Sequence, residues 1–411
     1  MINYKTNSLV AKIKKDSISV VLFGAGNMGE LAYHALKKRN VTVDYFCDSD
    51  KHKQGKLFYG IKVVSPNELS LMDRNKAIFI CNGQYVGAVS SLLDQMKFQL
   101  VYNLVDLLKN TDFSDSNLDQ NMFSKLSIKR QILLHEQNYL KTKNKINNEF
   151  NISNVDIVIT ERCSLKCKDC ANLMQYYVRP KNSDHDLLFK SVDRLMKCID
   201  KLYEFRVLGG DPFMNKKMYE VINKLVDYDN VDQVVIYTNV TILPKGENLE
   251  CLKNKKVRLQ ISNYGAVLSR KHDETIKLCE TNNILYVTER VTKWQDLGKI
   301  KYEEKTVDKL ENLFKNCCAN NLLTLIHGKL HGCPTAANGT NLRIIPNNPK
   351  DIVDLSDDKM SIEETRTQLR DLYYHKKFLT ACSYCKGRDY GFGEIDAAIQ
   401  TKKPLPLPNI N

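Results

Sequence analysis

Short apolar runs separated mostly by helix-compatible segments are the feature that most limits the fold of this chain. Six such runs occur in its second half: VDIVIT (155–160), FRVLGG (205–210), QVVIYTN (233–239), VRLQISN (257–263), ILYVTE (284–289) and LLTLIHG (322–328). Strands that alternate with helices form parallel sheets. We therefore predict an open, partial (β/α)6 barrel, in which functional groups gather at the carboxyl ends of the strands.

A second α/β pattern occupies the beginning of the chain. The apolar run ISVVLF at 18–23 is followed by GAGNMG, a helical stretch and two more strand-like runs. This order predicts a Rossmann-like parallel sheet with a nucleotide-binding turn. In such a turn the first glycine makes the bend, the second admits a phosphate and the third lets helix and strand approach. The candidate nucleotide-binding residues are Gly24, Gly26, Gly29 and, at the end of the second strand, Asp48.

The length of 411 residues predicts more than one domain. We expect a Rossmann-like nucleotide-binding domain at 1–110, a polar helical linker at 111–150 and the partial barrel at 151–316. A cysteine-bearing extension follows at 317–395. The Pro-rich tail at 396–411 is not expected to fold alone.

Composition narrows the class of protein. Hydrophobic residues make up 43% and charged residues 27%, as in globular proteins. No apolar run is long enough to span a membrane, and the first residues lack a secretory signal, so we expect a cytoplasmic protein. The net charge of +13 comes from lysines spread along the chain. Because no basic block is interleaved with aromatic residues, nucleic acid is not an expected partner.

Thirteen cysteines in a reducing compartment point to metal binding rather than to disulfides. Cys163, Cys167 and Cys170 have the spacing C-x3-C-x2-C directly after a predicted strand. Three thiolates suit a [4Fe–4S] cluster with one iron left for a small-molecule ligand, whereas structural zinc wants four ligands. His185 would be a distant fourth, so we favour the cluster over zinc.

At these residues the sequence resembles the radical S-adenosylmethionine (SAM) superfamily. LGGDP at 208–212 is similar to the family's G-G-E-P motif, and YTN at 237–239 is similar to its T-N-G. The resemblance implies that the cluster binds SAM, and that backbone carbonyls and an acid near the glycines accept hydrogen bonds from its ammonium group. The implied SAM-binding residues are Gly209, Gly210, Asp211, Thr238, Asn239, Ser262 and Asn263.

Two positions depart from the family's pattern. Asp169 stands where an aromatic residue usually precedes the third cysteine, and Asp211 is one methylene shorter than the usual glutamate. The implied reaction is reductive cleavage of SAM to a 5′-deoxyadenosyl radical, with electrons from a donor such as flavodoxin or ferredoxin. The candidate catalytic residues are three side chains near predicted strand ends: Glu289, Arg290 and Tyr264.

A second set of cysteines lies toward the C-terminus. It comprises the adjacent pair Cys317 and Cys318, of which one is the expected ligand, together with Cys333, Cys382 and Cys385. Four thiolates would satisfy zinc or a [4Fe–4S] cluster. The order C…G-x4-C…C-x2-C resembles the twitch form of the SPASM extension of radical SAM enzymes, which implies one auxiliary [4Fe–4S] cluster.

The N-terminal segment YFCDSDKHKQGKLFYGIKVVSPNEL resembles the nucleotide-sugar-binding domain of bacterial sugar N-acetyltransferases and related polysaccharide-biosynthesis proteins. The resemblance implies a nucleotide or nucleotide-sugar ligand. An NAD-like ligand and a vestigial or protein-docking domain remain open alternatives, because fold alone does not determine function.

Taken together, these features predict a radical SAM oxidoreductase that oxidises a sugar or nucleotide-sugar, with the auxiliary cluster as electron acceptor. Three alternatives stay open: a radical SAM epimerase or dehydratase of sugars, a peptide-modifying radical SAM maturase, and a zinc-stabilised nucleotide-sensing or scaffold protein.

Overall fold

The computed structural model describes residues 6–82, 86–114, 118, 128, 131–132, 135–136, 149–388 and 393–408. The chain divides into two compact units, residues 1–146 (unit 1) and residues 147–411 (unit 2). Most of the predicted helical linker at 111–150 lies outside the described residues. Within the described ranges no helix is both long enough and apolar enough to cross a membrane.

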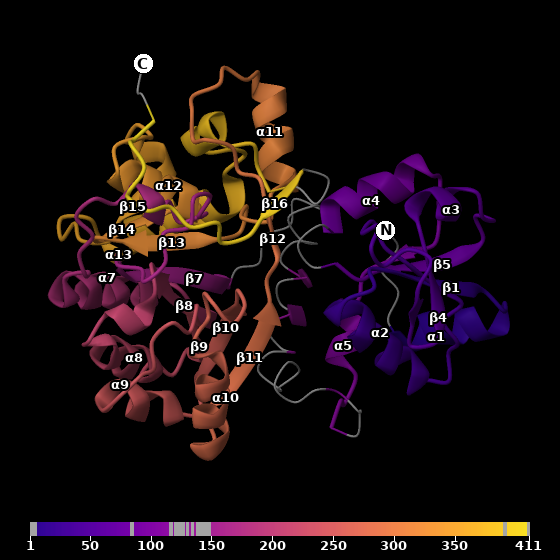
Figure 1. Ribbon diagram of the computed structural model, residues 1–411. Helices are drawn as coiled ribbons and strands as arrows, with labels where there is room; N and C mark the ends of the chain where they lie inside the picture. Colours follow the sequence, from indigo (N-terminus) through magenta and orange to yellow (C-terminus); the bar gives the residue numbers. More distant parts are fainter. Residues whose placement is uncertain are drawn as a thin grey trace. The chain divides into compact units, whose positions relative to one another are not determined.

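Unit 1 alternates strands and helices along the chain (Figure 1). Its elements are α1 (Thr6–Lys15), β1 (Ser19–Phe23), α2 (Asn27–Lys37), β2 (Tyr45–Cys47), β3 (Leu57–Phe58), β4 (Ile61–Val64), α3 (Pro66–Ser70), β5 (Lys76–Ile80), α4 (Val86–Gln95), β6 (Val101–Tyr102) and α5 (Val105–Lys109).

The sheet of unit 1 has the strand order β3-β4-β2-β1-β5-β6, and every pair except β3–β4 is parallel. Its central strands β1 and β5 are almost entirely buried, because two apolar clusters cover the two faces of the sheet. The strand order reverses between β1 and β5, so the glycine-rich turn after β1 lies where doubly wound sheets bind ligands. The prediction of a Rossmann-like parallel sheet is confirmed.

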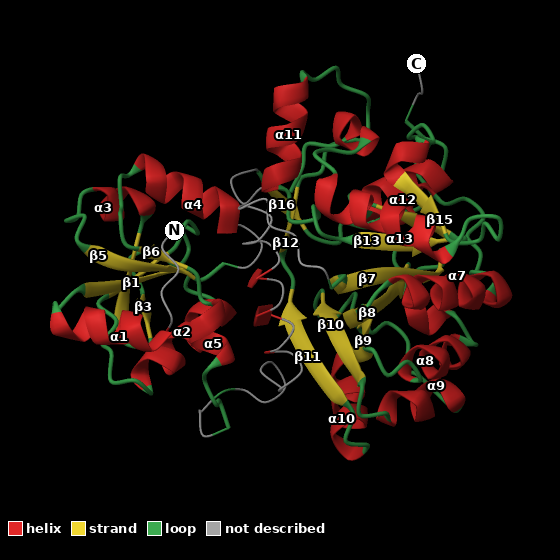
Figure 2. Ribbon diagram, turned by 180° about the vertical axis from the view of Figure 1, so that it is seen from behind, coloured by secondary structure: helices red, strands yellow, loops and turns green. Residues whose placement is uncertain are grey.

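Unit 2 is built on a longer series of strands and helices (Figure 2). Its main elements are β7 (Asn151–Thr160), α7 (His185–Cys198), β8 (Lys201–Gly209), α8 (Met218–Val226), β9 (Val231–Thr238), α9 (Glu247–Glu250), β10 (Val257–Asn263), α10 (His272–Thr281), β11 (Leu285–Arg290), β12 (Lys293–Gln295), α11 (Val307–Asn316), β13 (Leu323–Ile326), β14 (Lys329–His331), α12 (Pro334–Asn341), β15 (Ile352–Asp354), α13 (Ile362–Arg370) and β16 (Glu394–Asp396).

The large sheet of unit 2 has the order β11-β10-β9-β8-β7-β13-β14-β15. Strands β7 to β11 are parallel and follow one another in chain order, as a partial (β/α) barrel requires. The sixth predicted strand, β13, is also parallel but pairs with β7 instead of following β11. The hairpin of β13 and β14 therefore extends the barrel sheet, and the segment that carries Cys333 starts from this edge.

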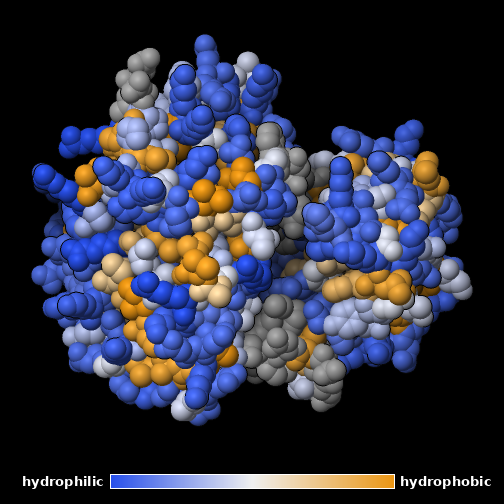
Figure 3. All heavy atoms as spheres, in the orientation of Figure 1, coloured by the Kyte–Doolittle hydropathy of each residue, from blue (hydrophilic) through white to orange (hydrophobic). Residues whose placement is uncertain are grey.

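One face of the large sheet is covered by α7 to α10, while β12 and β16 lie on its other side (Figure 1). Helix α7 shows why these segments are helical: Leu188, Val192 and Leu195 recur at helical spacing on its buried face, and Asp184 caps its first turn. Each fully buried side chain of this size contributes about 1.5–3 kcal/mol relative to an exposed one. The outer surface in the same view is largely hydrophilic, with apolar residues scattered among charged ones (Figure 3).

Candidate functional site

The residues of the C-x3-C-x2-C motif line one cavity of about 480 Å³ in unit 2. Strand β7 ends at Thr160, and the loop that carries the cysteines begins immediately after it. The same cavity is lined by residues at the carboxyl ends of β8, β9 and β10: Gly209, Gly210, Thr238, Asn239 and Ser262. A cavity of this size is within the range of small-molecule sites.

Gly209 and Gly210 let the ends of two strands approach each other. A Cβ atom on Gly209 would lie 2.0 Å from the carbonyl oxygen of Thr160, and one on Gly210 would lie 2.1 Å from that of Arg162. The amide of Gly210 donates to the Thr160 carbonyl at 2.9 Å. The contact of β8 with the cysteine loop thus requires both glycines, whereas the sequence had suggested only that they let a ligand approach the backbone.

The thiols of the motif receive hydrogen bonds from outside the loop. Asn239 Nδ2 lies 3.6 Å from Cys163 Sγ, and Gln400 Nε2 lies 3.2 Å from Cys167 Sγ. Burial raises the pKa of Cys167 to about 11 and also raises the pKa of Cys163 and Cys170. A bound metal would displace these protons, because thiolate is the ligand form. Three half-buried or buried thiols therefore lie beside one cavity, and two of them have a side-chain N–H donor that favours the thiolate form.

No group of three or more His, Cys, Asp or Glu side chains among the described residues is arranged to hold a metal ion. The thirteen cysteines are all free thiols. The ligand roles predicted for the cysteines therefore remain predictions.

The Asp211 carboxylate is buried and hydrogen-bonds to other residues of the protein. Asp211 is 1% exposed, and its carboxylate accepts hydrogen bonds from Thr238 Oγ1, from the Asn239 amide at 2.9 Å and from the Phe213 amide at 3.0 Å. It does not line the cavity. Burial raises its pKa, although these hydrogen bonds oppose the shift. Asp211 thus joins the ends of β8 and β9 next to the predicted SAM site.

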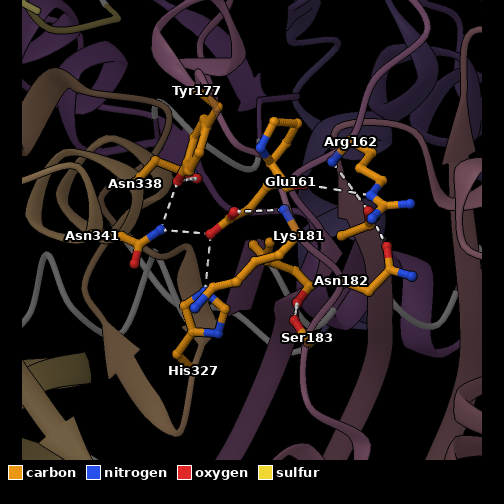
Figure 4. A network of polar contacts seen from close by, with 12 residues as sticks. Glu161, Arg162, Tyr177, Lys181, Asn182, Ser183, His327, Asn338 and Asn341 are labelled. Atoms are coloured by element: carbon orange, nitrogen blue, oxygen red, sulfur yellow. Dashed lines mark hydrogen bonds and ion pairs between the residues drawn. The ribbon is translucent and has the colours of Figure 1, made fainter.

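Glu161 joins the cysteine loop to the C-terminal part of unit 2 (Figure 4). Its carboxylate accepts hydrogen bonds from His327 Nε2 at 3.0 Å, Asn341 Nδ2 at 2.9 Å and the Lys181 amide at 3.0 Å. Burial alone would raise the pKa of Glu161, but the hydrogen bonds, that of His327 first, lower it overall. His327 follows β13, and Asn341 ends α12, whose N-cap is Cys333. The two cysteine sets are therefore connected through one buried carboxylate.

Of the catalytic candidates, only Tyr264 lines the cavity. Its ring lies edge-on to Trp294, with 5.7 Å between ring centroids. Glu289 and Arg290 are exposed on β11 and do not line the cavity. Asn263 also lies outside the lining. Its Oδ1 accepts from the Gly265 amide at 2.8 Å.

Charged residues inside the barrel strands form a wall of the cavity that was not predicted from the sequence. Asp156 on β7 pairs with Arg206 on β8, with 3.2 Å between Oδ1 and Nε, and the Arg206 guanidinium lies 4.7 Å from the ring centroid of Tyr237. Arg388 lines the same cavity. Burial raises the pKa of Asp156 to about 6, opposed by Arg206 and Arg388. The sequence held one signal of this wall: Asp156 and Arg206 each stand within an otherwise apolar strand. A charged residue buried in a strand usually has a partner or a function.

The C-terminal cysteines gather in one region of unit 2. Helix α12, whose N-cap is Cys333, contacts the 3-10 helix Thr380–Tyr384 that contains Cys382. The Cys318 amide donates to the Arg388 carbonyl at 3.2 Å, three residues after Cys385. Backbone amides donate to four of the thiols at 3.3–3.5 Å, namely those of Cys317, Cys333, Cys382 and Cys385.

Within the adjacent pair, the pKa values of the two thiols are shifted in opposite directions. A hydrogen bond with Cys317 and the charge of Arg388 lower the pKa of Cys318 to about 6 against the effect of burial, while the pKa of Cys317 rises. Amide donors and a neighbouring arginine favour the thiolate form of these cysteines, against the effect of burial.

In the glycine-rich turn of unit 1, Gly24 makes the bend and Gly29 lets helix and strand approach. A Cβ on Gly29 would lie 2.0 Å from the Gly24 carbonyl oxygen, so Gly29 permits the contact of α2 with the turn. Gly24 has a φ of +127°, which favours glycine. A Cβ on Gly26 would have Lys53 Nζ as its nearest neighbour at 3.9 Å, so this position is open. The Asp48 carboxylate accepts from the Ala25 amide at 2.8 Å and pairs with Lys53 at 3.2 Å.

Comparison with curated proteins finds local similarity to GTP 3′,8-cyclases. The chain is 23% identical over 144 residues to that of Clostridium acetobutylicum, covering 34% of this chain and 42% of the relative. It is 29% identical over 105 residues to that of Staphylococcus epidermidis, covering 24% of this chain and 30% of the relative. The chain thus spans less than half the length of these relatives. No family model matches it.

Among solved structures, the chain is similar to BtrN in complex with AdoMet and 2-DOIA, at 14% identity and a TM-score of 0.41, over 62% of this chain and 98% of BtrN. It is similar to anSMEcpe with bound AdoMet at 13% identity and a TM-score of 0.39, over 62% and 92% of the two chains. It is similar to Streptococcus suis SuiB bound to S-adenosylmethionine at 12% identity and a TM-score of 0.34, over 67% of this chain and 79% of SuiB.

Proposed function

We propose that unit 2 is a radical SAM enzyme in which Cys163, Cys167 and Cys170 hold a [4Fe–4S] cluster and the adjoining cavity binds SAM. The observation that carries this proposal is the convergence of the three thiols and the carboxyl ends of β8, β9 and β10 on one cavity. Three thiolates leave one iron of a cubane cluster without a protein ligand. When bound, the cluster and SAM supply a 5′-deoxyadenosyl radical that removes a hydrogen atom from the substrate.

The chain's own residues position and enclose the reactants. Asp211 orients Thr238 and Asn239 toward the cavity through buried hydrogen bonds. Trp294 and Leu297, on and after β12, line the cavity and limit access of water. In these roles Asp211, Trp294 and Leu297 transfer neither protons nor electrons.

We further propose that the substrate is a sugar or nucleotide-sugar. The wall formed by Asp156, Arg206 and Arg388 offers both a carboxylate and guanidinium groups to a ligand rich in hydroxyl and anionic groups. The open position at Gly26 and the neighbouring Lys53 make the turn of unit 1 suitable for a phosphate of the same class of ligand.

The reaction that fits the two cysteine sets best is oxidation of a hydroxyl-bearing carbon. The substrate would lose one hydrogen atom to the radical, one proton to Asp156 and one electron. A second cluster held by Cys333, Cys382, Cys385 and one of the pair Cys317 and Cys318 would supply the acceptor for that electron. Epimerisation would instead need a hydrogen-atom donor to return a hydrogen atom to the carbon radical, and dehydration would release water from the substrate radical before a hydrogen atom is returned.

Anaerobic reconstitution followed by activity measurement tests this proposal. The reduced protein should hold about eight irons per chain and release 5′-deoxyadenosine from SAM when a nucleotide-sugar is added. Release triggered by peptides alone would point to a peptide-modifying enzyme, and release triggered by GTP to the reaction class of the curated relatives. Zinc without iron would contradict the proposal.

A further inference from the structure

The C-terminal strap, residues 393–408, crosses the loop that carries the three motif cysteines. Strand β16 of the strap pairs with β12. Beyond it, the Lys168 amide donates to the Ile399 carbonyl and the Thr401 amide donates to the Lys166 carbonyl, both at 2.7 Å. Cys167 and Gln400 thus face each other in an antiparallel bridge. A segment expected not to fold alone is held here by main-chain hydrogen bonds to the cysteine loop.

The Gln400 side chain is held in one orientation at this crossing. Its Oε1 accepts from the Lys166 amide at 2.8 Å. Its Nε2 donates to the Ala398 carbonyl at 2.7 Å and to Cys167 Sγ at 3.2 Å. Because the carbonyl end is bound by an amide N–H, the NH2 end is the end that faces the sulfur. Ala398 beside it is 2% exposed, so the strap is packed against the loop even though Gln400 itself is exposed on its outer side.

From this geometry we infer that Gln400 is a positioning residue for the Cys167 thiolate and raises the reduction potential of the cluster that this thiolate helps to hold. The inference rests on the proposed function, because it requires a cluster on Cys167. An N–H donor to a ligand sulfur stabilises the more negatively charged, reduced form of an iron–sulfur cluster. The strap also covers Cys167, which is 7% exposed, and so limits the solvation of this ligand.

Two substitutions at Gln400 remove the N–H donor to Cys167 Sγ while keeping a side chain of similar size. Gln400→Glu keeps an oxygen that can accept from the Lys166 amide, but it replaces the donor to Cys167 Sγ by a carboxylate oxygen. Gln400→Leu removes the donor without adding charge. Thr401→Val is the matched control: Thr401 lies on the same strap, and its hydroxyl donates to the carbonyls of Lys166 and Lys403 but not to a sulfur.

The measurement is a potentiometric titration of the reconstituted protein. It is followed by EPR, through the cluster signal that changes when SAM is added. We expect a more negative midpoint potential in both Gln400 variants, with the larger shift in Gln400→Glu, and the wild-type value in Thr401→Val. Iron content is measured on the same samples, so that a loss of cluster is distinguished from a shift in potential.

The hydrogen bond from Gln400 Nε2 to Cys167 Sγ can also be detected directly in the wild-type protein. With ¹⁵N in the glutamine side-chain amides, pulsed EPR of the reduced cluster should show a nitrogen coupling that disappears in Gln400→Leu. Wild-type potential in both Gln400 variants, or the same shift in Thr401→Val, overturns this inference and leaves the proposed function standing. A wild-type chain that holds no cluster on Cys167 overturns both.

Discussion

The carboxylate of Glu161 lies 3.0 Å from Nε2 of His327 and joins the loop that precedes Cys163 to the turn after β13. The Glu161 side chain is 4% exposed and that of His327 is 22% exposed, so this contact is largely shielded from solvent. One buried acid therefore ties the first cysteine set to the hairpin that leads to Cys333 of the second set.

Replacing Glu161 by Gln should destabilise unit 2, because the amide cannot accept all three of the hydrogen bonds that the carboxylate accepts. We expect a loss of about 1–3 kcal/mol in the free energy of unfolding. The protein's one tryptophan, Trp294, lies in unit 2, so its fluorescence in a urea titration reports on this unit. The exposed Glu363→Gln is the control and should leave the midpoint unchanged. Equal midpoints for Glu161→Gln and wild type would remove the connecting role of Glu161.

Two glycines of the sequence GAGNMG should respond differently to substitution. Gly29→Ala places a methyl group 2.0 Å from the Gly24 carbonyl oxygen and should destabilise unit 1. Gly26→Ala meets no atom closer than 3.9 Å and should leave stability unchanged, but it should weaken nucleotide-sugar binding if the phosphate lies there. Thermal melting and calorimetric titration with a nucleotide-sugar separate the two effects. Normal binding by Gly26→Ala would contradict the proposed ligand site.

Much of this arrangement was predictable, because local patterns specify it. Continuous apolar runs such as ISVVLF and VDIVIT form buried parallel strands, and the motif cysteines follow β7 directly. The position of β13 was not predictable, since strand order depends on pairing between segments far apart in sequence: Leu323 of β13 lies opposite Val155 of β7. Gln400 was missed for the same reason, because its contact with Cys167 joins residues 233 positions apart.

Acid should destabilise unit 1 through His135. Burial lowers the pKa of His135 to about 4, below the value of about 6.5 expected in the unfolded chain. Between these values the unfolded state binds more protons, so stability falls as the pH drops from about 6.5 toward 4, by at most about 3 kcal/mol from this group. Hydrogen exchange of the β1 amides at pH 7 and pH 5 measures the effect. His135→Leu should show a smaller difference between the two pH values, and an unchanged difference would exclude this group as the cause.

Asp156 should govern the pH dependence of substrate oxidation under the proposed function. Its pKa is raised to about 6, so the carboxylate form that can accept a proton increases as the pH rises through 6. The yield of oxidised product per 5′-deoxyadenosine should rise over the same interval in the wild type. In Asp156→Asn this rise should be absent, while SAM cleavage itself continues. A pH profile that is the same in both proteins would rule out Asp156 as the proton acceptor.

The central claim is that Cys163, Cys167 and Cys170 hold a SAM-binding [4Fe–4S] cluster. Its most direct test is iron content together with EPR of the reduced protein before and after addition of SAM, in the wild type and in Cys163→Ala/Cys167→Ala/Cys170→Ala. We predict that the triple variant loses about four irons per chain and the SAM-dependent change of the EPR signal, while Cys279→Ala, at a buried cysteine outside both sets, retains both. A triple variant with wild-type iron content and a wild-type response to SAM would contradict the claim.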